Sequence, residues 1–363
     1  RRTYPSATGR VKLGEERLEP GGCIGRNGPG QPDPGPSGGA GERPQDADAP
    51  FLRYLICFLP VLAGCLALAE YLWVPNLKGN RSTPTYAYFL AVLIVASLAF
   101  FAAAFRSRRV FYRLRYKAPF YAFVFLLLAG YDILTLKRGT LMLPYFPWVD
   151  EILNAAWQDR AYLLDCTLNS LFLLFSGYFV GAGLGLVTGV ACGYNRGVDY
   201  WVAPFMKLLG AIPSPTWIPV VMVVASSLFA GSVFIIALGV WYSLTIATMT
   251  GIRNIDRSFY EAARTLGARP RHLVVNVALP FALPNILQGL TQGMSSACMA
   301  LIVAEMVGVE SGLGWYVSWQ KSWAQYGKMY AAIIVLCIVF VFVNWGLNRI
   351  KRWVLRWQEG VVQ

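Results

Sequence analysis

DCTLNSLFLLFSGYFVGAGLGLVTGVACG, residues 165–193, contains a single charged residue, Asp165, at its start. An α-helix advances about 1.5 Å per residue, so this run is long enough to cross the roughly 30 Å hydrocarbon core of a bilayer. A membrane β-barrel would instead show alternating segments of about ten residues. The stretch therefore predicts a membrane-spanning helix.

Other apolar runs of similar length lie on both sides of this one. Of the 363 residues, 56% are hydrophobic and 14% charged, whereas soluble domains carry about 25% charged residues. The mean hydropathy is +0.47. We therefore predict an all-α polytopic membrane protein with about eight transmembrane helices. The further runs fall at about 51–74, 86–105, 118–136, 204–226, 231–252, 281–307 and 329–350.

Basic residues orient these spans. Segments 106–117, 253–280 and 349–356 carry six, five and four arginines or lysines, and eight spans would place all three on one side. The positive-inside rule makes that side cytoplasmic, with both termini there. The same rule explains the net charge of +13 better than a nucleic-acid partner does. We expect a multi-pass protein of a bacterial inner membrane.

The remaining composition limits other kinds of site. Residues 1–50 are rich in glycine and proline, and we expect a disordered tail. The seven cysteines show no C-x-x-C spacing and the chain has one histidine, His272, so we expect neither a disulfide framework nor a metal site.

Two spans have unusual interiors. In 165–193 a glycine recurs at every fourth position, which favours close packing of a neighbouring helix. In IPSPTWIPV, residues 212–220, three prolines must distort or delay a helix. This second feature fits either the lining of a pathway within the membrane or a structural kink. The recurring glycines are Gly177, Gly181, Gly185, Gly189 and Gly193.

The segment SFYEAARTLGARPRHLVVNVALP, residues 258–280, carries signals for two helices separated by a turn. Ser258 and Glu261 have the spacing of a capping box, which predicts a helix starting at Phe259. Gly267 suits the left-handed position that closes a helix, and Pro270 suits the first turn of the next.

The first of these helices is predicted to be amphipathic. Phe259, Ala262, Ala263 and Leu266 lie on one face, at positions i, i+3, i+4 and i+7. Two turns are too short to be stable alone, so the helix should dock on another surface.

The same segment resembles a known signature. The pattern EAA-x3-G-x9-I-x-LP of ABC importer permeases is matched except at Val277, where isoleucine is usual. The resemblance extends over about 165–357. Within it, the glycine-rich span, IPSPTWIPV, this loop and AEMVGVESGLGW (304–315) come in an order that resembles the branch for nitrate, sulfonate, taurine and bicarbonate. The matching residues are Glu261, Ala262, Ala263, Gly267, Leu279 and Pro280.

The resemblance implies a type I importer permease bundle. Residues 139–357 would form the permease domain with a core of five spans, and 51–138 would add three N-terminal spans. The loop 253–280 would be the cytoplasmic coupling helix that contacts an ATPase. The residues assigned to coupling are Ser258, Phe259, Glu261, Ala262, Ala263, Arg264, Leu266, Gly267, Leu279 and Pro280.

The implied function is permeation of a small solute, such as nitrate, taurine, an alkanesulfonate or bicarbonate. The implied partners are two ATPase subunits that bind ATP and Mg²⁺, a second permease copy in a homodimer, an extracytoplasmic solute-binding protein and the bilayer. The sequence shows no GxxxxGK[ST] motif, so ATP hydrolysis is expected in the partner and no cofactor in this chain.

Polar residues inside spans mark function by default. Gln288, Gln292 and Ser295 share one helix face, which fits either a pathway or interhelical hydrogen bonds. Glu305 is expected to be structural or gating, paired with a cation or a hydroxyl. Asp132 and Asp165 are expected to be solvated at the outer boundary. The candidates for the pathway or gate are Pro213, Pro215, Gln288, Gln292, Ser295 and Glu305.

Two other classes of function remain open at this point. An ion-gradient-driven secondary transporter is one, although no inverted repeat is visible. A membrane-anchored scaffold or enzyme is the other, although no spacing supports a nucleophile–base pair and no catalytic residue is assigned.

Overall fold

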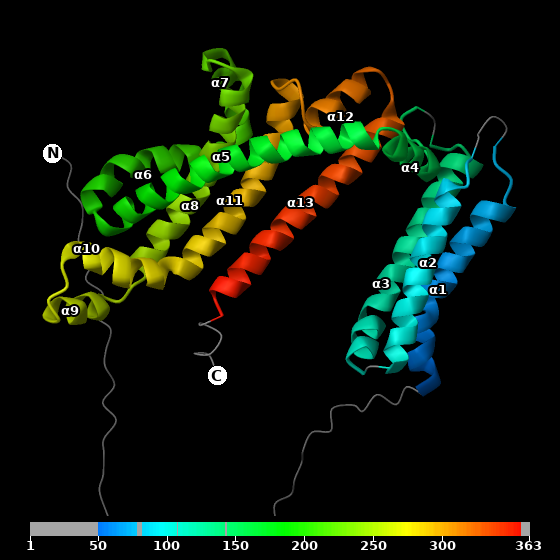
Figure 1. Cartoon of the computed structure of the whole chain (residues 1–363), viewed down its shortest axis with the longest axis horizontal. Helices are drawn as coiled ribbons and strands as arrows, with labels where there is room; N and C mark the ends of the chain where they lie inside the picture. Colours follow the sequence, from blue (N-terminus) through cyan, green and yellow to red (C-terminus); the bar gives the residue numbers. More distant parts are fainter. Residues whose placement is uncertain (1–49, 78–81, 107, 142–143, 357–363) are drawn as a thin grey trace, which may run out of the picture. The chain divides into compact units, whose positions relative to one another are not determined.

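The computed structural model describes residues 50–77, 82–106, 108–141 and 144–356, and every regular element within these ranges is helical (Figure 1). Apart from Pro50, the tail predicted for residues 1–50 lies outside the described residues. The α-helices are α1 (Pro50–Trp73), α2 (Thr85–Arg106), α3 (Arg108–Asp132), α4 (Val149–Gln158), α5 (Arg160–Tyr194), α6 (Arg196–Ala211), α7 (Ile218–Val224), α8 (Leu228–Arg253), α9 (Arg257–Thr265), α10 (Pro270–His272), α11 (Leu279–Val307), α12 (Leu313–Ser322) and α13 (Tyr326–Val354).

Seven helical spans of the described chain are long and apolar enough to cross a membrane. The pair α6 and α7, bent by 94°, provides an eighth only if it counts as one span. The run predicted at 204–226 therefore contains a sharp break, in agreement with the distortion predicted from its prolines. Pro213 and Pro215 lack a backbone N–H, and a 3-10 turn, Ser214–Trp217, joins the two helices at the bend.

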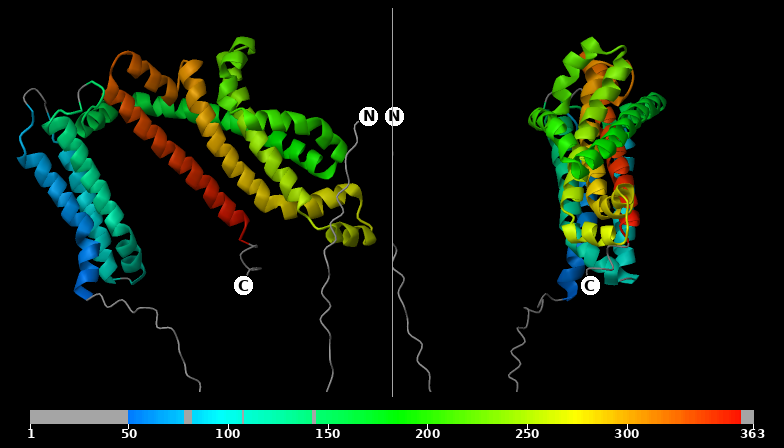
Figure 2. Two further views of the ribbon diagram at one scale, coloured as in Figure 1. Left: turned by 180° about the vertical axis from the view of Figure 1, so that it is seen from behind. Right: turned by 90° about the vertical axis from the view of Figure 1, so that its left-hand side faces the viewer.

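Helices α5, α8 and α11 form the centre of the bundle, where they lie side by side (Figures 1 and 2). The recurring glycines of α5 face α8. A Cβ atom at Gly185 would lie 3.0 Å from the Leu244 Cβ, and one at Gly189 would lie 2.6 Å from the Thr248 Cβ. Real Cβ atoms essentially never approach to 2.6 Å, so position 189 requires glycine at this helix separation, and the 3.0 Å contact at position 185 would be tighter than nearly all real ones.

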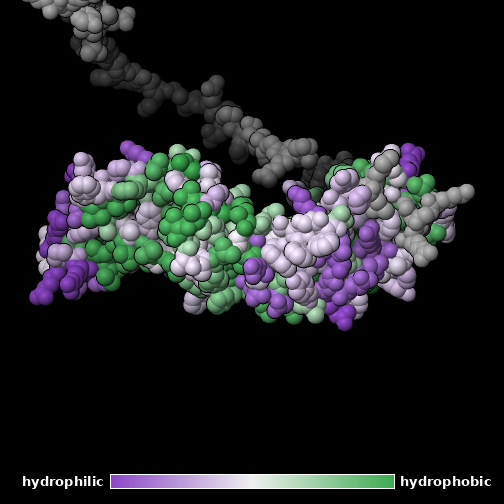
Figure 3. All heavy atoms as spheres, turned by 90° about the horizontal axis from the view of Figure 1, so that it is seen from above, coloured by the Kyte–Doolittle hydropathy of each residue, from purple (hydrophilic) through white to green (hydrophobic). Residues whose placement is uncertain are grey.

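Apolar side chains also cover much of the exterior. Phe179, Leu184 and Val187 of α5 are 67%, 56% and 69% exposed. Figure 3 shows such hydrophobic residues spread across one face of the molecule. A soluble protein rarely exposes apolar surface of this extent, whereas lipid tails cover it without cost. The chain is a multi-pass membrane protein.

Helices α1, α2 and α3 share an apolar core of their own, which includes Ala67, Leu90 and Phe125. One contact between this unit and the next helix is polar. The carboxylate of Asp150, in the first turn of α4, accepts hydrogen bonds from the Thr83 N–H at 2.6 Å and from the Tyr86 N–H at 3.1 Å. Asp150 thus satisfies donors at the start of α2, which a helix cannot satisfy itself.

Asp132, at the end of α3, corrects the expectation that it would be solvated. Its side chain is fully buried near Glu70 of α1, and both carboxyl oxygens lack a hydrogen-bond partner within the described chain. Position along a helix axis does not determine which face a residue occupies, and α3 places this one inside the three-helix unit. Asp165 is exposed, as expected.

Asp159 joins α12 and α13 just outside the start of α5. Its Oδ2 accepts a hydrogen bond from the Tyr316 hydroxyl at 2.6 Å and lies 2.9 Å from the Lys328 Nζ. Burial alone would raise the pKa of Asp159, but the hydrogen bonds from Tyr316 and Lys328 and the lysine charge together lower it from 3.8. The ionised carboxylate is therefore the form that holds these helices.

This geometry predicts a pH dependence of stability. Because the folded pKa is lowered, the stabilisation by Asp159 should be complete well above pH 3.8 and disappear as the pH falls through the lowered value. Asp159→Asn should remove about 1–3 kcal/mol at pH 7, and the difference from wild type should shrink near pH 3. Thermal unfolding in detergent at both pH values measures this, and an equal difference at both would contradict it.

Candidate coupling site and membrane pathway

The segment predicted to dock is an exposed helix, α9, at the end of α11 opposite α12 (Figures 1 and 2). Its start differs from the prediction. The N-cap is Asp256, whose carboxylate accepts a hydrogen bond from the Ser258 N–H at 3.0 Å, and the helix begins at Arg257. The capping-box assignment of Ser258 and Glu261 is therefore wrong, because an aspartate two residues earlier competes for the same position.

The end of α9 is closed as the sequence predicts. Gly267 has φ +82°, a left-handed conformation that costs side-chain-bearing residues about 1–2 kcal/mol. The Gly267 N–H donates to the Arg264 carbonyl at 2.9 Å and the Ala268 N–H to the Ala263 carbonyl at 3.1 Å. These two bonds form a Schellman motif, which stops the helix after nine residues.

The apolar face of α9 is largely uncovered by the described chain. Leu266 is 89% exposed and Phe259 54% exposed, and no residue of α9 is buried. Contact with the body of the bundle is confined to one side, where the Phe259 ring lies 5.8 Å from that of Phe281 and Tyr260 packs beside Ile255. Ala262 is exposed and Ala263 half-buried.

The segment after α9 turns the chain into the membrane. Pro270 begins α10 as predicted, and a π-helical turn, Leu273–Ala278, leads into α11. Leu279 packs in an apolar cluster with Ala282, and Pro280 lies in the first turn of α11, directly after the π-helical turn. The last two signature residues thus anchor the loop that presents α9.

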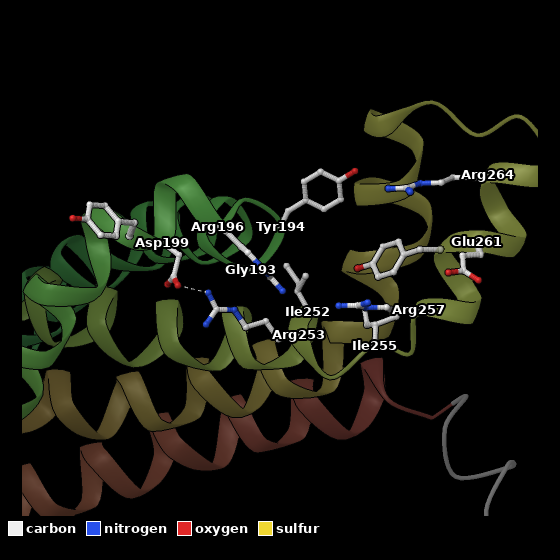
Figure 4. A pocket seen from close by; sticks show the side chains of 12 residues that line it. Gly193, Tyr194, Arg196, Asp199, Ile252, Arg253, Ile255, Arg257, Glu261 and Arg264 are labelled. Carbon is white, nitrogen blue, oxygen red and sulfur yellow. Dashed lines mark ion pairs between the residues drawn. The ribbon is translucent and has the colours of Figure 1, made fainter.

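A cavity of about 1000 Å³ lies between α9 and the α5–α6 corner (Figure 4). Arginines from three helices line it. Arg253 forms an ion pair with Asp199 at 2.7 Å and donates to the Cys192 carbonyl at 3.1 Å. The other basic residues on its wall are Arg196, Arg257 and Arg264. This end of the bundle is strongly basic.

The predicted pathway residues do not form one group. Gln288 accepts a hydrogen bond from Lys351 of α13, and the Ser295 hydroxyl donates to the Thr291 carbonyl of its own helix at 3.5 Å. Gln292 lies in a separate cavity of about 260 Å³ together with Pro213, while Pro215 belongs to the 3-10 turn of the bend.

Glu305 lies at the far end of α11 and is 1% exposed. Its Oε2 accepts a hydrogen bond from the Gly314 N–H at 2.8 Å, and the Ser170 hydroxyl lies beside the carboxyl. Gly312, with φ +111°, leaves the space that the carboxyl fills. Glu305 therefore fastens the turn after α11 to the bundle, and no cation among the described residues pairs with it.

Known proteins resemble this arrangement of segments. Residues 181–357 match the family described as "Binding-protein-dependent transport system inner membrane component". The putative aliphatic sulfonates transport permease protein SsuC of Bacillus subtilis is 30% identical over 111 residues, which are 31% of this chain and 40% of that protein. The bicarbonate transport system permease protein CmpB of Synechococcus elongatus is 28% identical over 114 residues, 31% of this chain and 41% of CmpB.

Among solved structures, an inward-facing conformation of the MetNI methionine ABC transporter is 23% identical, with a TM-score of 0.47 over 54% of this chain and 98% of that one. The aligned segments span about two fifths of the curated relatives. The resemblance seen in the Glu261–Pro280 signature is confirmed: residues 181–357 match the family of inner membrane components of binding-protein-dependent transport systems, and both relatives are named as transport permease proteins.

Proposed function

We propose that this chain is the permease subunit of an ATP-driven importer. It forms the pathway for a small solute, and α9 couples it to ATP hydrolysis in a partner subunit. The observation that carries this proposal is the state of α9. A nine-residue helix with a capped start, a Schellman end and no buried residue has its conformation set by its own chain, while Leu266 and Ala262 remain uncovered. Such a surface fits a groove on a partner.

The partners follow from the same surfaces. A cytoplasmic ATPase, two copies per transporter, would bind α9 and supply the ATP and Mg²⁺ chemistry. The exposed helix faces would contact a second permease copy and lipid, and a solute-binding protein would deliver the solute on the opposite side. The family description, which names dependence on a binding protein, supports the last of these.

The orientation follows from charge. The α9 end carries Arg253, Arg257 and Arg264, and the end of α13 carries Lys351 and Arg352. We place these ends in the cytoplasm by the positive-inside rule, with both termini on that side of the inner membrane. The solute-binding protein would then meet α4 and α12.

The solute is proposed to be a small oxyanion or sulfonate. The support is that SsuC is named for aliphatic sulfonates and CmpB for bicarbonate. These solutes share a compact head of negatively charged oxygen atoms.

A crosslinking experiment tests the coupling assignment. A photo-crosslinking amino acid at Leu266, the 89% exposed C-cap residue of α9, should attach to the co-expressed cognate ATPase. The matched control is Trp157 of α4, which is 69% exposed at the other end of the bundle and should not react with the ATPase. Equal crosslinking at both positions, or none at Leu266, would contradict the assignment. Solute uptake that persists without any ATPase would favour the secondary transporter instead.

A further inference from the structure

The small cavity at the α6–α7 bend has an unusual lining. It holds about 260 Å³ and is bounded by the bend, by α8 and by α11, and none of its lining residues is charged. A volume of this size suits a solute of a few heavy atoms. The lining residues that carry polar side chains are Ser214, Tyr242, Ser243, Gln292 and Ser296.

Two of these hydroxyls converge over a single glycine. A Cβ atom at Gly239 of α8 would lie 2.7 Å from the Ser296 Oγ and 2.9 Å from the Ser214 Oγ. Any side chain at this position would therefore displace both hydroxyls. Ser214 comes from the bend and Ser296 from α11, so three segments meet here.

The hydroxyl of Tyr242 likewise occupies space that a side chain on a neighbouring helix would fill. A Cβ atom at Gly210 of α6 would overlap the hydroxyl of Tyr242, which projects from α8 toward the bend. The absence of side chains at Gly210 and Gly239 thus leaves room for polar groups from neighbouring helices.

These donors differ from several other hydroxyls in the membrane spans. Ser176, Thr188 and Ser232 each donate to the carbonyl four residues earlier in their own helix, at 2.7, 2.8 and 2.9 Å. Such a bond satisfies a hydroxyl internally. In contrast, the side chains of Ser214, Tyr242, Gln292 and Ser296 make no hydrogen bond to any other described residue. Their hydrogen-bonding capacity is available to a molecule in the cavity that these residues line.

The chemistry of this lining favours an anion. Hydroxyl and amide N–H groups donate to negatively charged oxygens, and such bonds are strong where water is partly excluded. A cation would find no carboxylate in the lining. The absence of an arginine or lysine also matters for transport, because a site that conducts must bind weakly enough to release its solute.

We propose that this cavity is an oxyanion-binding site within the membrane, in which Ser214, Tyr242, Gln292 and Ser296 donate hydrogen bonds to a nitrate-, bicarbonate- or sulfonate-like group. Its place in a transport pathway rests on the function proposed above, whereas the binding itself does not. Among the residues that line this cavity, only Pro213 and Gln292 are pathway candidates from the sequence alone.

Thermal unfolding of the purified chain in lipid nanodiscs tests the site without any ATPase. The probes are sodium nitrate and sodium methanesulfonate in a gluconate buffer, with choline gluconate as the cationic comparison. At least one of the two anions should raise the unfolding temperature saturably, and choline should not. In the variant Ser214→Ala/Ser296→Ala, the apparent Kd should rise by about tenfold or more, because two bonds to a charged group are lost.

The matched control is Ser295→Ala. This serine is adjacent to Ser296, but its hydroxyl bonds to its own helix, so the apparent Kd should stay at the wild-type value. Tyr242→Phe keeps the ring and removes one hydroxyl. It replaces the double variant if that variant does not fold, and its apparent Kd should also rise. The proposal is overturned if neither anion binds saturably, if choline stabilises equally, or if the folded hydroxyl-deleted variants bind like wild type. The Gly267→Pro variant, which disrupts the turn after α9, should bind the anion with the wild-type apparent Kd. Anion binding in this variant would show that the cavity works independently of the coupling function.

Discussion

Gly181→Leu should destabilise the folded bundle by about 3 kcal/mol or more, the upper range for overpacking a close contact. A Cβ atom at this position would overlap the Ala237 carbonyl oxygen of α8 and lie 2.9 Å from the Ala237 Cα. Both obstacles are backbone atoms, so no side-chain rotation relieves them, and α5 would have to move away from α8. Thermal unfolding in detergent, or the fraction that elutes as a single species, measures the loss.

Gly183→Leu is the matched control for this prediction. It lies two residues along the same helix, is exposed, and has no heavy atom within 4 Å of an added Cβ. Its stability should change by no more than about 1 kcal/mol, with a gain favoured by helix propensity. Equal losses of stability in the Gly181→Leu and Gly183→Leu variants would show that α5 does not pack on α8 through its glycine face.

The features predicted well from sequence are those set by local chemistry or by repetition. The glycine at every fourth position indicates one helix face wherever the helix lies, and the structure places Gly181 and Gly185 against α8. Gly267 was predictable because few other residues adopt φ +82° at a helix end. The lengths of the apolar runs predicted the membrane-spanning helices, since a helix needs about 20 residues to cross a bilayer.

The features predicted poorly depend on tertiary contacts. Prolines signal a break between α6 and α7, but their positions do not give the size of the bend, which is 94° in a structure where α7 contacts α8. Asp132 was misplaced because a helix boundary says nothing about which face is buried. The N-cap of α9 was assigned to Ser258 because two capping patterns overlap there, and the structure selects Asp256.

The polar cavity was only partly predictable. Gln292 and Ser296 lie on adjacent turns of one span, a signal visible in sequence. Ser214 and Tyr242 were missed because they come from segments 28 residues apart that the fold alone brings together. Gly239 and Gly210, which leave room for these hydroxyls, are visible in the sequence. Their role can be recognised only when it is known which helix faces each glycine.

Gly267→Pro should abolish association with the ATPase while leaving the bundle folded. Proline fixes φ near −65°, whereas Gly267 has φ +82°, and it removes the N–H that donates to Arg264. The Schellman turn would be lost at a cost of about 3 kcal/mol, and α9 would no longer be held in place. Because nothing lies within 4 Å of an added Cβ, the damage should stay in the loop.

Gly267→Asn is the matched control for the turn. Asparagine tolerates the left-handed conformation better than other residues with a side chain, so the turn and α9 should persist. Association should then remain within about threefold of wild type, which corresponds to less than 1 kcal/mol. ATP-driven uptake in proteoliposomes with the solute-binding protein should follow the same order.

The ratio of ATPase to permease in the purified complex shows whether α9 couples this chain to an ATPase. Wild type and Gly267→Asn should each retain the co-expressed ATPase at the same ratio, and Gly267→Pro should retain almost none while its unfolding temperature stays near that of wild type. If the folded Gly267→Pro protein retains the ATPase at the wild-type ratio, α9 is not the coupling element.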